Sequence, residues 1–295
     1  MPNITELYFF DPDELEVVAD RGREAYGRAE PFPHVVLDGL FPDELLDEVL
    51  REARMADDRS NWVKWNDPNS IKSGLREDWT MGPTTRLLLG QFNSAVFVNF
   101  LERLTGISGL IPDPHFFGGG IHTIESGGYL RIHADFNQHP RLVLLRRINA
   151  LLYLNRDWDD EWGGHLELWN RDLSNPVQTI APIFNRLVIF TITDTSYHGH
   201  PNPLETPPGI DRRSLALYYY SVEEEAIEPH STLWQPGVGE RVPRPGDPPA
   251  RVTVAAGQAP TNGADSTHSA KQVLHDWIPP VVWRAASRIK ASRGG

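Results

Sequence analysis

Residues 129–141 read YLRIHADFNQHPR, and the first half of this stretch has the residue types of a β-strand. His133 and Asp135 stand two positions apart in it, so their side chains point to the same face of the strand. An imidazole and a carboxylate aimed at one point can bind a metal ion or transfer a proton. Such a pair is common by itself, so its meaning depends on the residues around it.

Short β-rich segments surround this stretch from about residue 110 onward. They are separated by Gly, Pro, Asn or Asp, and they read GGGIHTI, INALLYLN, HLELWN, VQTIAP, RLVIFTI and RSLALYYYS. Closely spaced strands of this kind are typical of an antiparallel sandwich or jelly roll. We therefore expect a mainly β fold with supporting α-structure, in which a double-stranded β-helix (jelly roll) core is flanked by N-terminal helices.

The residues before 110 have mostly helical periods. Residues 1–30 are charged and helical in pattern, and PDELLDEVLREA, residues 42–53, has one apolar face. Residues 85–106, TRLLLGQFNSAVFVNFLERLTG, predict one long amphipathic helix that ends at Gly106. Between these helices, NWVKWNDPNSIKSG has the composition of a loop that carries Trp62 and Trp65.

These patterns divide the chain into four parts. In order, they are an N-terminal helical support with a substrate-side loop, a jelly-roll catalytic core, a Pro/Gly-rich linker and a C-terminal helical segment. Their predicted bounds are 1–110, 111–235, 236–265 and 266–295.

Composition limits the classes of function. The 295 residues contain no cysteine, so a metal would have to be held by His, Asp or Glu. A formal net charge of −12 argues against a nucleic-acid partner. No apolar run is long enough to span a membrane, and the N-terminus lacks the pattern of a signal peptide. We expect a cytoplasmic location, and the sequence makes no prediction of oligomeric state.

A second metal-binding segment, TDTSYHGHP, follows the apolar strand NRLVIFTIT. It places His198 and His200 just beyond the end of that strand. Together with His133 and Asp135, either histidine would complete a set of two imidazoles and one carboxylate on two strands of a jelly roll. This ligand set suits non-haem Fe(II), because it leaves coordination positions open on one side.

Arg212 and Arg213 open the next apolar strand and point to opposite faces of it. An arginine on the inner face of a barrel is costly unless it meets an anion. A dicarboxylate that chelates the metal at one end would supply this anion at its other end. The strand pattern alone leaves open which of the two arginines faces inward.

Three ordered segments resemble the catalytic core of the Fe(II)/2-oxoglutarate-dependent dioxygenases, in particular the prolyl-4-hydroxylase-like branch of bacterial type. They are YLRIHADF, LLYLNRDWDDEWGGHLELW, and FNRLVIFTITDTSYHGHP with RRSLALYYY. PFPHVVLDGLFPDELLDEVL resembles the N-terminal support of bacterial members. The resemblance implies that Fe(II), 2-oxoglutarate and O2 are the cofactor and co-substrates.

The resemblance also implies roles for individual residues. His133, Asp135 and His198 would bind the iron, and Arg212 would bind the distal carboxylate of 2-oxoglutarate. Tyr153 matches a tyrosine that contacts this carboxylate.

Four further side chains are weaker candidates. Asn149 shares a strand face with Tyr153 and would line the co-substrate pocket. On the substrate side we expect Asn137, His200 and Trp62. The acidic turn DWDDEWGGH is given no catalytic role.

The activity implied is hydroxylation of an unactivated C–H bond, with release of succinate and CO2. The substrate would be amino-acid-like, peptidyl or a small metabolite. Two alternatives remain. A cupin-like metal enzyme would not need the arginine after His198, and a non-catalytic binding or sensing module would have lost a metal ligand.

Overall fold

A computed structural model describes residues 8–56, 62–222 and 227–241. Its α-helices are α1 (Pro12–Arg28), α2 (Asp43–Met55), α3 (Pro83–Phe92) and α4 (Ala95–Thr105), with 3-10 turns at Asp78–Thr80 and Asp160–Trp162. Its strands are β1 (His34–Asp38), β2 (Val63–Asp67), β3 (Ser70–Leu75), β4 (Ile111–Pro112), β5 (Gly120–Ile124), β6 (Tyr129–Ala134), β7 (Leu145–Tyr153), β8 (Leu166–Trp169), β9 (Pro176–Ile180), β10 (Arg186–Thr191), β11 (His198–His200), β12 (Arg212–Ser221) and β13 (Leu233–Trp234).

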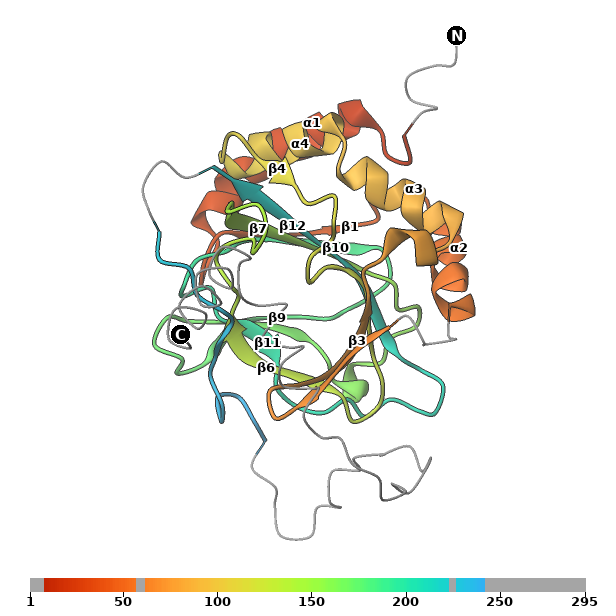
Figure 1. The fold of residues 1–295 in the computed structure, drawn as a ribbon, viewed down its shortest axis with the longest axis vertical. Helices are drawn as coiled ribbons and strands as arrows, with labels where there is room; N and C mark the ends of the chain where they lie inside the picture. The colour runs from red at the N-terminus through yellow and green to blue at the C-terminus, as the bar shows by residue number, and fades with distance from the viewer. Residues whose placement is uncertain (1–7, 57–61, 223–226, 242–295) are drawn as a thin grey trace, which may run out of the picture.

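The strands of the described residues form one curled antiparallel sheet. Its main path runs β1-β10-β7-β12-β5-β3-β6-β11-β8-β9. Because the sheet curls, β6, β9 and β11 lie below β7, β10 and β12 in Figure 1. This curled sheet with helices on one side confirms the predicted mainly β, jelly-roll fold.

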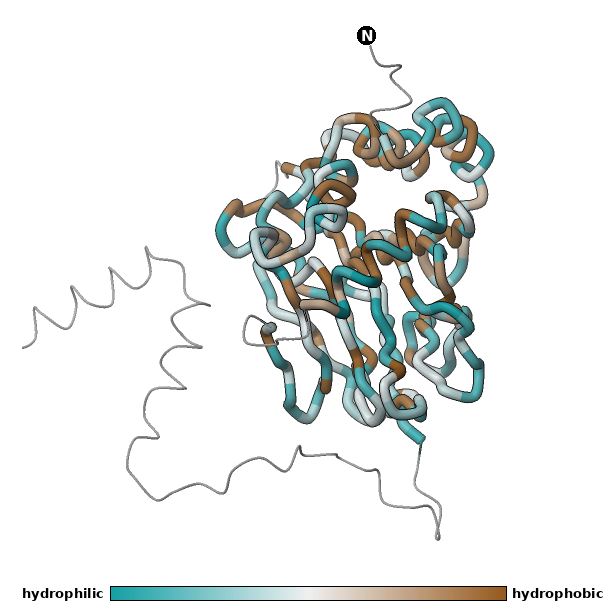
Figure 2. The backbone as a smooth tube through the Cα atoms, turned by 90° about the vertical axis from the view of Figure 1, so that its right-hand side faces the viewer, coloured by the Kyte–Doolittle hydropathy of each residue, from teal (hydrophilic) through white to brown (hydrophobic). Residues whose placement is uncertain are grey.

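The helices cover the outer face of the β1–β10–β7–β12 layer (Figure 1). Strand β7 is buried on both faces: Ile148, Ala150 and Leu152 join the apolar core beneath the helices, whereas Leu151 and Tyr153 join a second core inside the barrel. Along the helices, hydrophobic and hydrophilic residues alternate in Figure 2, as amphipathic helices require. Strand β7 therefore contributes apolar side chains both to the core beneath the helices and to the core inside the barrel.

The predicted long helix at residues 85–106 is wrong in one respect, because the structure has two helices there. α3 ends at Phe92, and Ser94 caps α4 by accepting a hydrogen bond on Oγ from the Phe97 amide, at 3.4 Å. Serine competes for backbone donors in this way, which favours a helix start over a helix interior. The predicted end at Gly106 is confirmed, since Gly106 has a φ of 75° at the C-cap.

The loop predicted for residues 61–74 is also wrong, because β2 and β3 form an antiparallel hairpin there. Asp67 Oδ1 accepts hydrogen bonds from the amides of Asn69 and Ser70, at 2.8 and 3.2 Å, and so closes the turn. β3 then pairs with β5 and β6, which makes the hairpin part of the barrel wall.

The predicted four-part division of the chain stays a prediction, although strands from both sides of residue 110 join the same sheet. The predicted C-terminal helical segment and residues 242–265 of the predicted linker lie outside the described residues. Within the residues described, no helix is long and apolar enough to cross a membrane.

Candidate metal and co-substrate site

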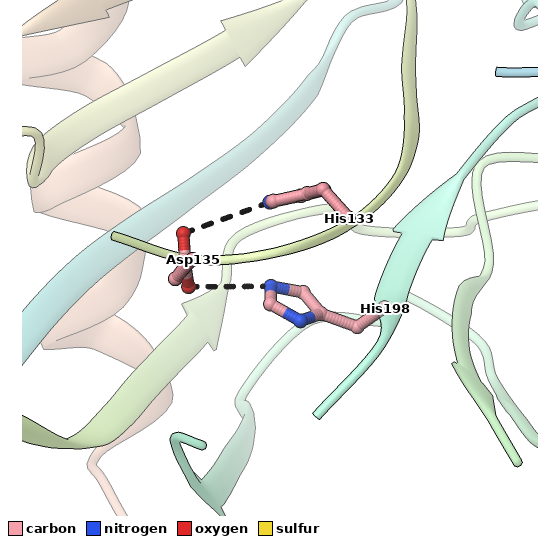
Figure 3. Close-up of side chains that lie close together, drawn as sticks. All are labelled: His133, Asp135 and His198. Atoms are coloured by element: carbon pink, nitrogen blue, oxygen red, sulfur yellow. Dashed lines mark ion pairs between the residues drawn. The ribbon is translucent and has the colours of Figure 1, made fainter. Parts of the chain in front are cut away.

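His133, Asp135 and His198 converge in the barrel interior (Figure 3). Antiparallel pairing of β6 and β11 sets His133 directly opposite His198. Asp135 Oδ1 lies 3.6 Å from His133 Nε2, and Asp135 Oδ2 lies 3.4 Å from His198 Nε2. One ligand atom from each side chain lies within 4.8 Å of the others, a spacing that can hold one metal ion.

Each of these histidines is oriented by a backbone carbonyl two residues earlier in the chain. His133 Nδ1 lies 2.8 Å from the Arg131 carbonyl, and His198 Nδ1 lies 2.9 Å from the Ser196 carbonyl. Because a carbonyl only accepts, each Nδ1 must carry the proton, which leaves both Nε2 lone pairs free for a metal. Burial and the neighbouring His133 lower the pKa of His198 to about 4, so this imidazole is neutral at pH 7.

The Asp135 carboxylate is fixed by two buried side chains, those of Arg146 and Asn149. Asp135 Oδ2 lies 3.0 Å from Arg146 Nη2 and accepts a 2.8 Å hydrogen bond from Asn149 Nδ2. Burial raises the pKa of Asp135, but Arg146 and the two histidines lower it by more. The net pKa therefore lies well below its ordinary value. Asp135 is therefore an ionised carboxylate fixed in one orientation.

Arg146 is itself locked in place by aromatic rings and by Asn149. Its guanidinium carbon lies 3.5 Å from the centroid of the Tyr218 ring and 4.4 Å from that of Phe136. Its Nε and Nη2 donate to Asn149 Oδ1 at 3.0 and 2.7 Å. Stacking and paired hydrogen bonds make this a rigid support for the carboxylate.

Arg212 also points into the barrel. Its Nε donates to the Gly164 carbonyl at 2.7 Å, and its Nη2 donates to the Tyr153 hydroxyl at 3.2 Å. Both Arg212 and Tyr153 are buried, and no carboxylate in the described part of the chain pairs with Arg212. A buried cation of this kind calls for an anion from outside.

Other basic side chains share this interior. His200 is buried, and neither of its ring nitrogens has a hydrogen-bond partner among the described residues. Burial, then Arg212, Lys72 and His133, lower the pKa of His200 well below its ordinary value. The interior therefore holds neutral imidazoles together with cationic side chains.

The structure brings together most of the side chains that the sequence nominated. The metal-ligand candidates lie together, and Arg212 lies against Tyr153. Arg213 lies on the other face of β12, where it pairs with Asp211 at 3.1 Å. Asn149 contacts Asp135 rather than Arg212.

Two side chains expected on the substrate side have other contacts. Asn137 donates from Nδ2 to the Glu228 carbonyl at 3.0 Å and accepts from the His230 amide at 2.9 Å, so it ties down the segment before β13. Trp62 is buried in the core shared with the helices and donates to the Ala56 carbonyl at 2.9 Å.

Several residues of the site were not found from the sequence. Arg146, at the start of an apolar strand, gave the same signal as Arg212, namely a charge where a buried strand begins. Lys72 was hidden because its segment was taken for a loop. The ring centroid of Trp234 lies 4.9 Å from that of His133, because β13 pairs with β6. No local sequence pattern predicts this pairing.

Residues 119–220 match the family model described as the 2OG-Fe(II) oxygenase superfamily. This part of the chain is therefore similar to the oxygenase domain of that superfamily, whose members use Fe(II), 2-oxoglutarate and O2. The match spans β6, β11 and β12, and it includes His133, Asp135, His198 and Arg212.

Individual proteins are similar as well. The prolyl 3,4-dihydroxylase OGFOD1 of Ostreococcus tauri is 27% identical over 186 residues, which cover 57% of this chain and 34% of the relative. The chain thus spans about a third of the length of that curated relative. A Trichoplax adhaerens prolyl hydroxylase, solved with a hypoxia-inducible-factor peptide fragment, has a TM-score of 0.52 at 16% identity over 75% of this chain and 94% of its own. A prolyl-4-hydroxylase of Pseudomonas putida has a TM-score of 0.49 at 18% identity, over 71% of this chain and all of its own.

The residues present fit the cofactor and co-substrate of this superfamily. Two neutral imidazoles and one carboxylate are the donor set that Fe(II) takes. The buried Arg212, without an acidic partner in the described residues, fits a dicarboxylate. This cation and the family match weigh against the cupin-like alternative, and the complete ligand set weighs against a module that has lost its metal.

Proposed function

We propose that this protein is an Fe(II)- and 2-oxoglutarate-dependent oxygenase that hydroxylates an unactivated C–H bond and releases succinate and CO2. One observation carries the proposal. One barrel contains the Nε2 atoms of His133 and His198, the Asp135 carboxylate and the buried Arg212. Among the residues that the structure describes, Arg212 has no acidic partner. This arrangement fits a divalent metal ion and a dianion.

His133, Asp135 and His198 would hold the metal from one side. The carbonyl bonds to both Nδ1 atoms fix the rings before the metal arrives, so little reorganisation is needed on binding. When bound, the metal and 2-oxoglutarate together with O2 supply the oxidising equivalents for hydroxylation.

Arg212 and Tyr153 would bind the distal carboxylate of 2-oxoglutarate. The guanidinium already uses Nε on Gly164 and is oriented by it, so the remaining donors can meet a carboxylate without rearrangement. Tyr153 OH would act as a second donor to the same group. Tight binding of the distal end positions the other end at the metal.

Aromatic side chains line the part of the interior nearest the metal. Trp234 packs on His133, Phe190 packs on His198 with ring centroids 4.8 Å apart, and Tyr218 covers Arg146. Such walls exclude water, which protects a reactive oxidant and favours an apolar carbon as the site of reaction.

The substrate class we put first is a prolyl residue in a polypeptide. This choice is supported by the relative named as a prolyl 3,4-dihydroxylase and by the Trichoplax prolyl hydroxylase solved with a peptide. Free amino acids and small metabolites are the next classes to test.

The test is succinate release from 2-oxoglutarate by the Fe(II)-loaded protein in air, with and without proline-containing peptides. We expect a peptide-stimulated rate that is lost in Asp135→Ala and falls in Arg212→Met, while the surface variant Arg241→Met keeps the wild-type rate. Mass spectrometry should find a 16 Da gain on the peptide, the mass of one added oxygen atom. Wild-type protein that binds Fe(II) but never consumes 2-oxoglutarate would contradict the proposed function.

A further inference from the structure

Trp234 lies beside the candidate metal ligands on a short strand that the sequence did not predict. β13 pairs with β6 in antiparallel register, which sets Trp234 directly opposite His133. Residues that are opposite each other in such a pair project from the same face of the sheet, so Trp234 shares the face of His133. β11 pairs with the other edge of β6 and sets His198 opposite the same residue. The His133 ring therefore stands between two others, with centroids 4.5 Å away for His198 and 4.9 Å away for Trp234.

β13 lies along the part of the β6 edge that β3 leaves open. β3 pairs with β6 at Tyr129 and Leu130, and it then turns away from β6 to pair with β5. Further along β6 the partner is β13, and the Gln235 amide extends this pairing by donating to the Ile132 carbonyl at 2.8 Å. Trp234 therefore forms the border of the candidate metal site along this edge.

The segment that carries Trp234 is tied to residues that precede the metal ligands in the chain. Before β13, in addition to the hydrogen bonds of Asn137, His230 Nε2 lies 2.9 Å from Asp194 Oδ1. After β13, Glu240 Oε1 lies 2.7 Å from Arg131 Nε. Because the segment is held on both sides of β13, the indole ring is positioned before a substrate binds.

The indole of Trp234 has binding capacity that the described residues do not use. The buried Trp62, Trp158 and Trp169 each donate from Nε1 to an acceptor, at 2.9, 3.1 and 2.8 Å. Trp234 is only partly buried, and its Nε1 has no acceptor among the described residues. Since the side chain projects to the face of His133, its accessible part lies next to the metal ligands.

An aromatic face with a donor at its edge suits a prolyl residue in a polypeptide. Indole Nε1 can only donate, and a prolyl residue, which has no backbone N–H, offers only a carbonyl acceptor. The saturated pyrrolidine ring also presents apolar C–H groups that can pack on the indole face. One side chain beside the metal ligands thus meets both properties of the substrate.

We propose that Trp234 is a substrate-binding residue, which packs its ring on a prolyl side chain and donates from Nε1 to a carbonyl oxygen of the substrate polypeptide. This inference rests on the proposed function, since it takes a prolyl residue in a polypeptide as the substrate. Contact with a ring that is held against His133 places the pyrrolidine beside the metal ligands. Trp234 therefore determines which carbon of the substrate is close enough to react.

The test separates substrate binding from support of the His133 ring. Trp234→Phe keeps an aromatic ring but removes the donor, and Trp234→Ala removes both. Leu233→Ala is the matched control, because Leu233 is the neighbouring residue of β13, points to the opposite face and is 36% exposed.

Two kinds of measurement are made on each variant. Calorimetry on protein loaded with Mn(II) in place of Fe(II) reports metal and 2-oxoglutarate binding. Turnover of the Fe(II)-loaded protein uses the proline-containing peptide that best stimulates succinate release by the wild type. It gives the KM for this peptide and the ratio of hydroxylated peptide to succinate, which a loss of packing on His133 alone would not change.

We expect Trp234→Phe to bind Mn(II) and 2-oxoglutarate like the wild type. Its KM for the peptide should rise about 2- to 10-fold, the loss typical of one neutral hydrogen bond. Trp234→Ala should raise the KM further and lower the ratio of hydroxylated peptide to succinate, because the reacting carbon is no longer positioned. Leu233→Ala should change neither quantity.

An unchanged peptide KM in Trp234→Phe, or losses confined to metal and 2-oxoglutarate binding, would overturn the inference. Peptide-stimulated turnover by the wild type would still support the proposed function in that case. A wild type that releases succinate but hydroxylates no proline-containing peptide would overturn the inference and leave the oxygenase chemistry standing. A wild type that consumes no 2-oxoglutarate would overturn both.

Discussion

Arg212 owes its position to a glycine in a turn that looked like a solvated connection. Gly164 has a φ of 70°, and its carbonyl accepts from Arg212 Nε. A Cβ at this position would collide with Leu204 Cδ2 and would lie 3.0 Å from Arg212 Cδ. The adjacent Gly163 has a φ of 72° and nothing within 4 Å of its would-be Cβ. The two glycines share a positive φ but differ in what a side chain would displace.

This difference gives a paired prediction. Gly163→Ala and Gly164→Ala should each lose roughly 1–2 kcal/mol of folding stability, because alanine rarely adopts positive φ. Only Gly164→Ala should also weaken 2-oxoglutarate binding, by displacing Arg212. Chemical denaturation measures the first effect and calorimetry with Mn(II)-loaded protein the second. Equal co-substrate affinity in the two variants would show that Arg212 does not anchor the ligand.

We expect Asn149 to strengthen metal binding by His133, Asp135 and His198. Its amide donates to Asp135 Oδ2 and accepts from Arg146, so Asn149→Ala frees the carboxylate to rotate. Loss of such an outer hydrogen bond typically weakens metal binding about 10- to 100-fold. Competition with a metal chelator measures this for Fe(II) or Mn(II), with the exposed Asn175→Ala as control. Unchanged affinity would mean that Arg146 alone holds the carboxylate.

The centre of the candidate site could be predicted from the sequence because its geometry is local. His133 and Asp135 share a face through the two-residue period of one strand. The same rule places Arg212 and Arg213 on opposite faces, and the family resemblance selected Arg212 as the inward one. Lys72 and Arg146 could not be given partners in this way. Their contacts depend on β3 lying beside β5 and β6 and on a carboxylate eleven positions before Arg146, and a strand period does not encode such neighbours.

At the scale of elements, the strands of the jelly roll were predictable and the boundaries of the helices less so. Buried residues recur at helical spacing within α3 and again within α4, so a window that spans both helices resembles one amphipathic helix. The two helices are separated at Ser94, whose hydroxyl oxygen accepts a hydrogen bond from the Phe97 amide. This side-chain acceptor competes with the backbone carbonyl that would continue the helix. The β2–β3 hairpin was missed for a similar reason, because its turn depends on the Asp67 carboxylate.

The start of α3 depends on a side chain from another helix. Glu52 of α2 is buried and accepts hydrogen bonds from the amides of Thr84 and Thr85 and from the Thr85 hydroxyl, at 2.9, 2.8 and 2.7 Å. Because α3 has no side-chain cap of its own, this carboxylate takes that role and ties α2 to α3.

Removing this contact should destabilise the protein. Glu52→Ala should cost about 1–3 kcal/mol in the free energy of unfolding, because buried donors lose their acceptor. Burial raises the pKa of Glu52, but the bonds from Thr85 and Thr84 lower it more, so the net pKa lies below 4.5. The stabilisation is therefore complete above pH 4.5 and is lost as the pH falls through the lower, folded-state pKa. Urea denaturation from pH 7 down to about pH 3 measures both effects. Glu48→Ala, which removes only a partly exposed pair with Arg51 on the same helix, should follow the wild type. Equal pH profiles for the two variants would contradict the capping role.

At the scale of the molecule, the helices and the sheet share one apolar core. Phe97 of α4 is fully buried and packs against Phe92 of α3 and Tyr219 of β12, with ring centroids 4.6 and 6.3 Å away. The outer surface of the same helix is joined to α1 by Arg103, which pairs with Asp20 at 2.6 Å and is 42% exposed. Burial of apolar area, rather than surface charge, should therefore hold the helical layer on the barrel.

Two variants of α4 separate these contributions. Phe97→Ala should lower the free energy of unfolding by about 3–5 kcal/mol through lost burial and a cavity. Arg103→Ala should leave the unfolding curve close to that of the wild type, since exposed ion pairs are screened by water and salt. Denaturant unfolding at two salt concentrations tests both. A larger loss for Arg103→Ala than for Phe97→Ala would contradict this view of the fold.

The central claim is that the barrel holds one metal between His133, Asp135 and His198 and one 2-oxo acid against Arg212. The most direct test is the visible charge-transfer band that forms when Fe(II) and 2-oxoglutarate are added to the apoprotein without oxygen. The account predicts a band in the wild type, no band in His133→Ala, and a band in Arg212→Met only at much higher 2-oxoglutarate concentration. Fe(II) binding without a band at any 2-oxoglutarate concentration, or a band that survives His133→Ala, would contradict it.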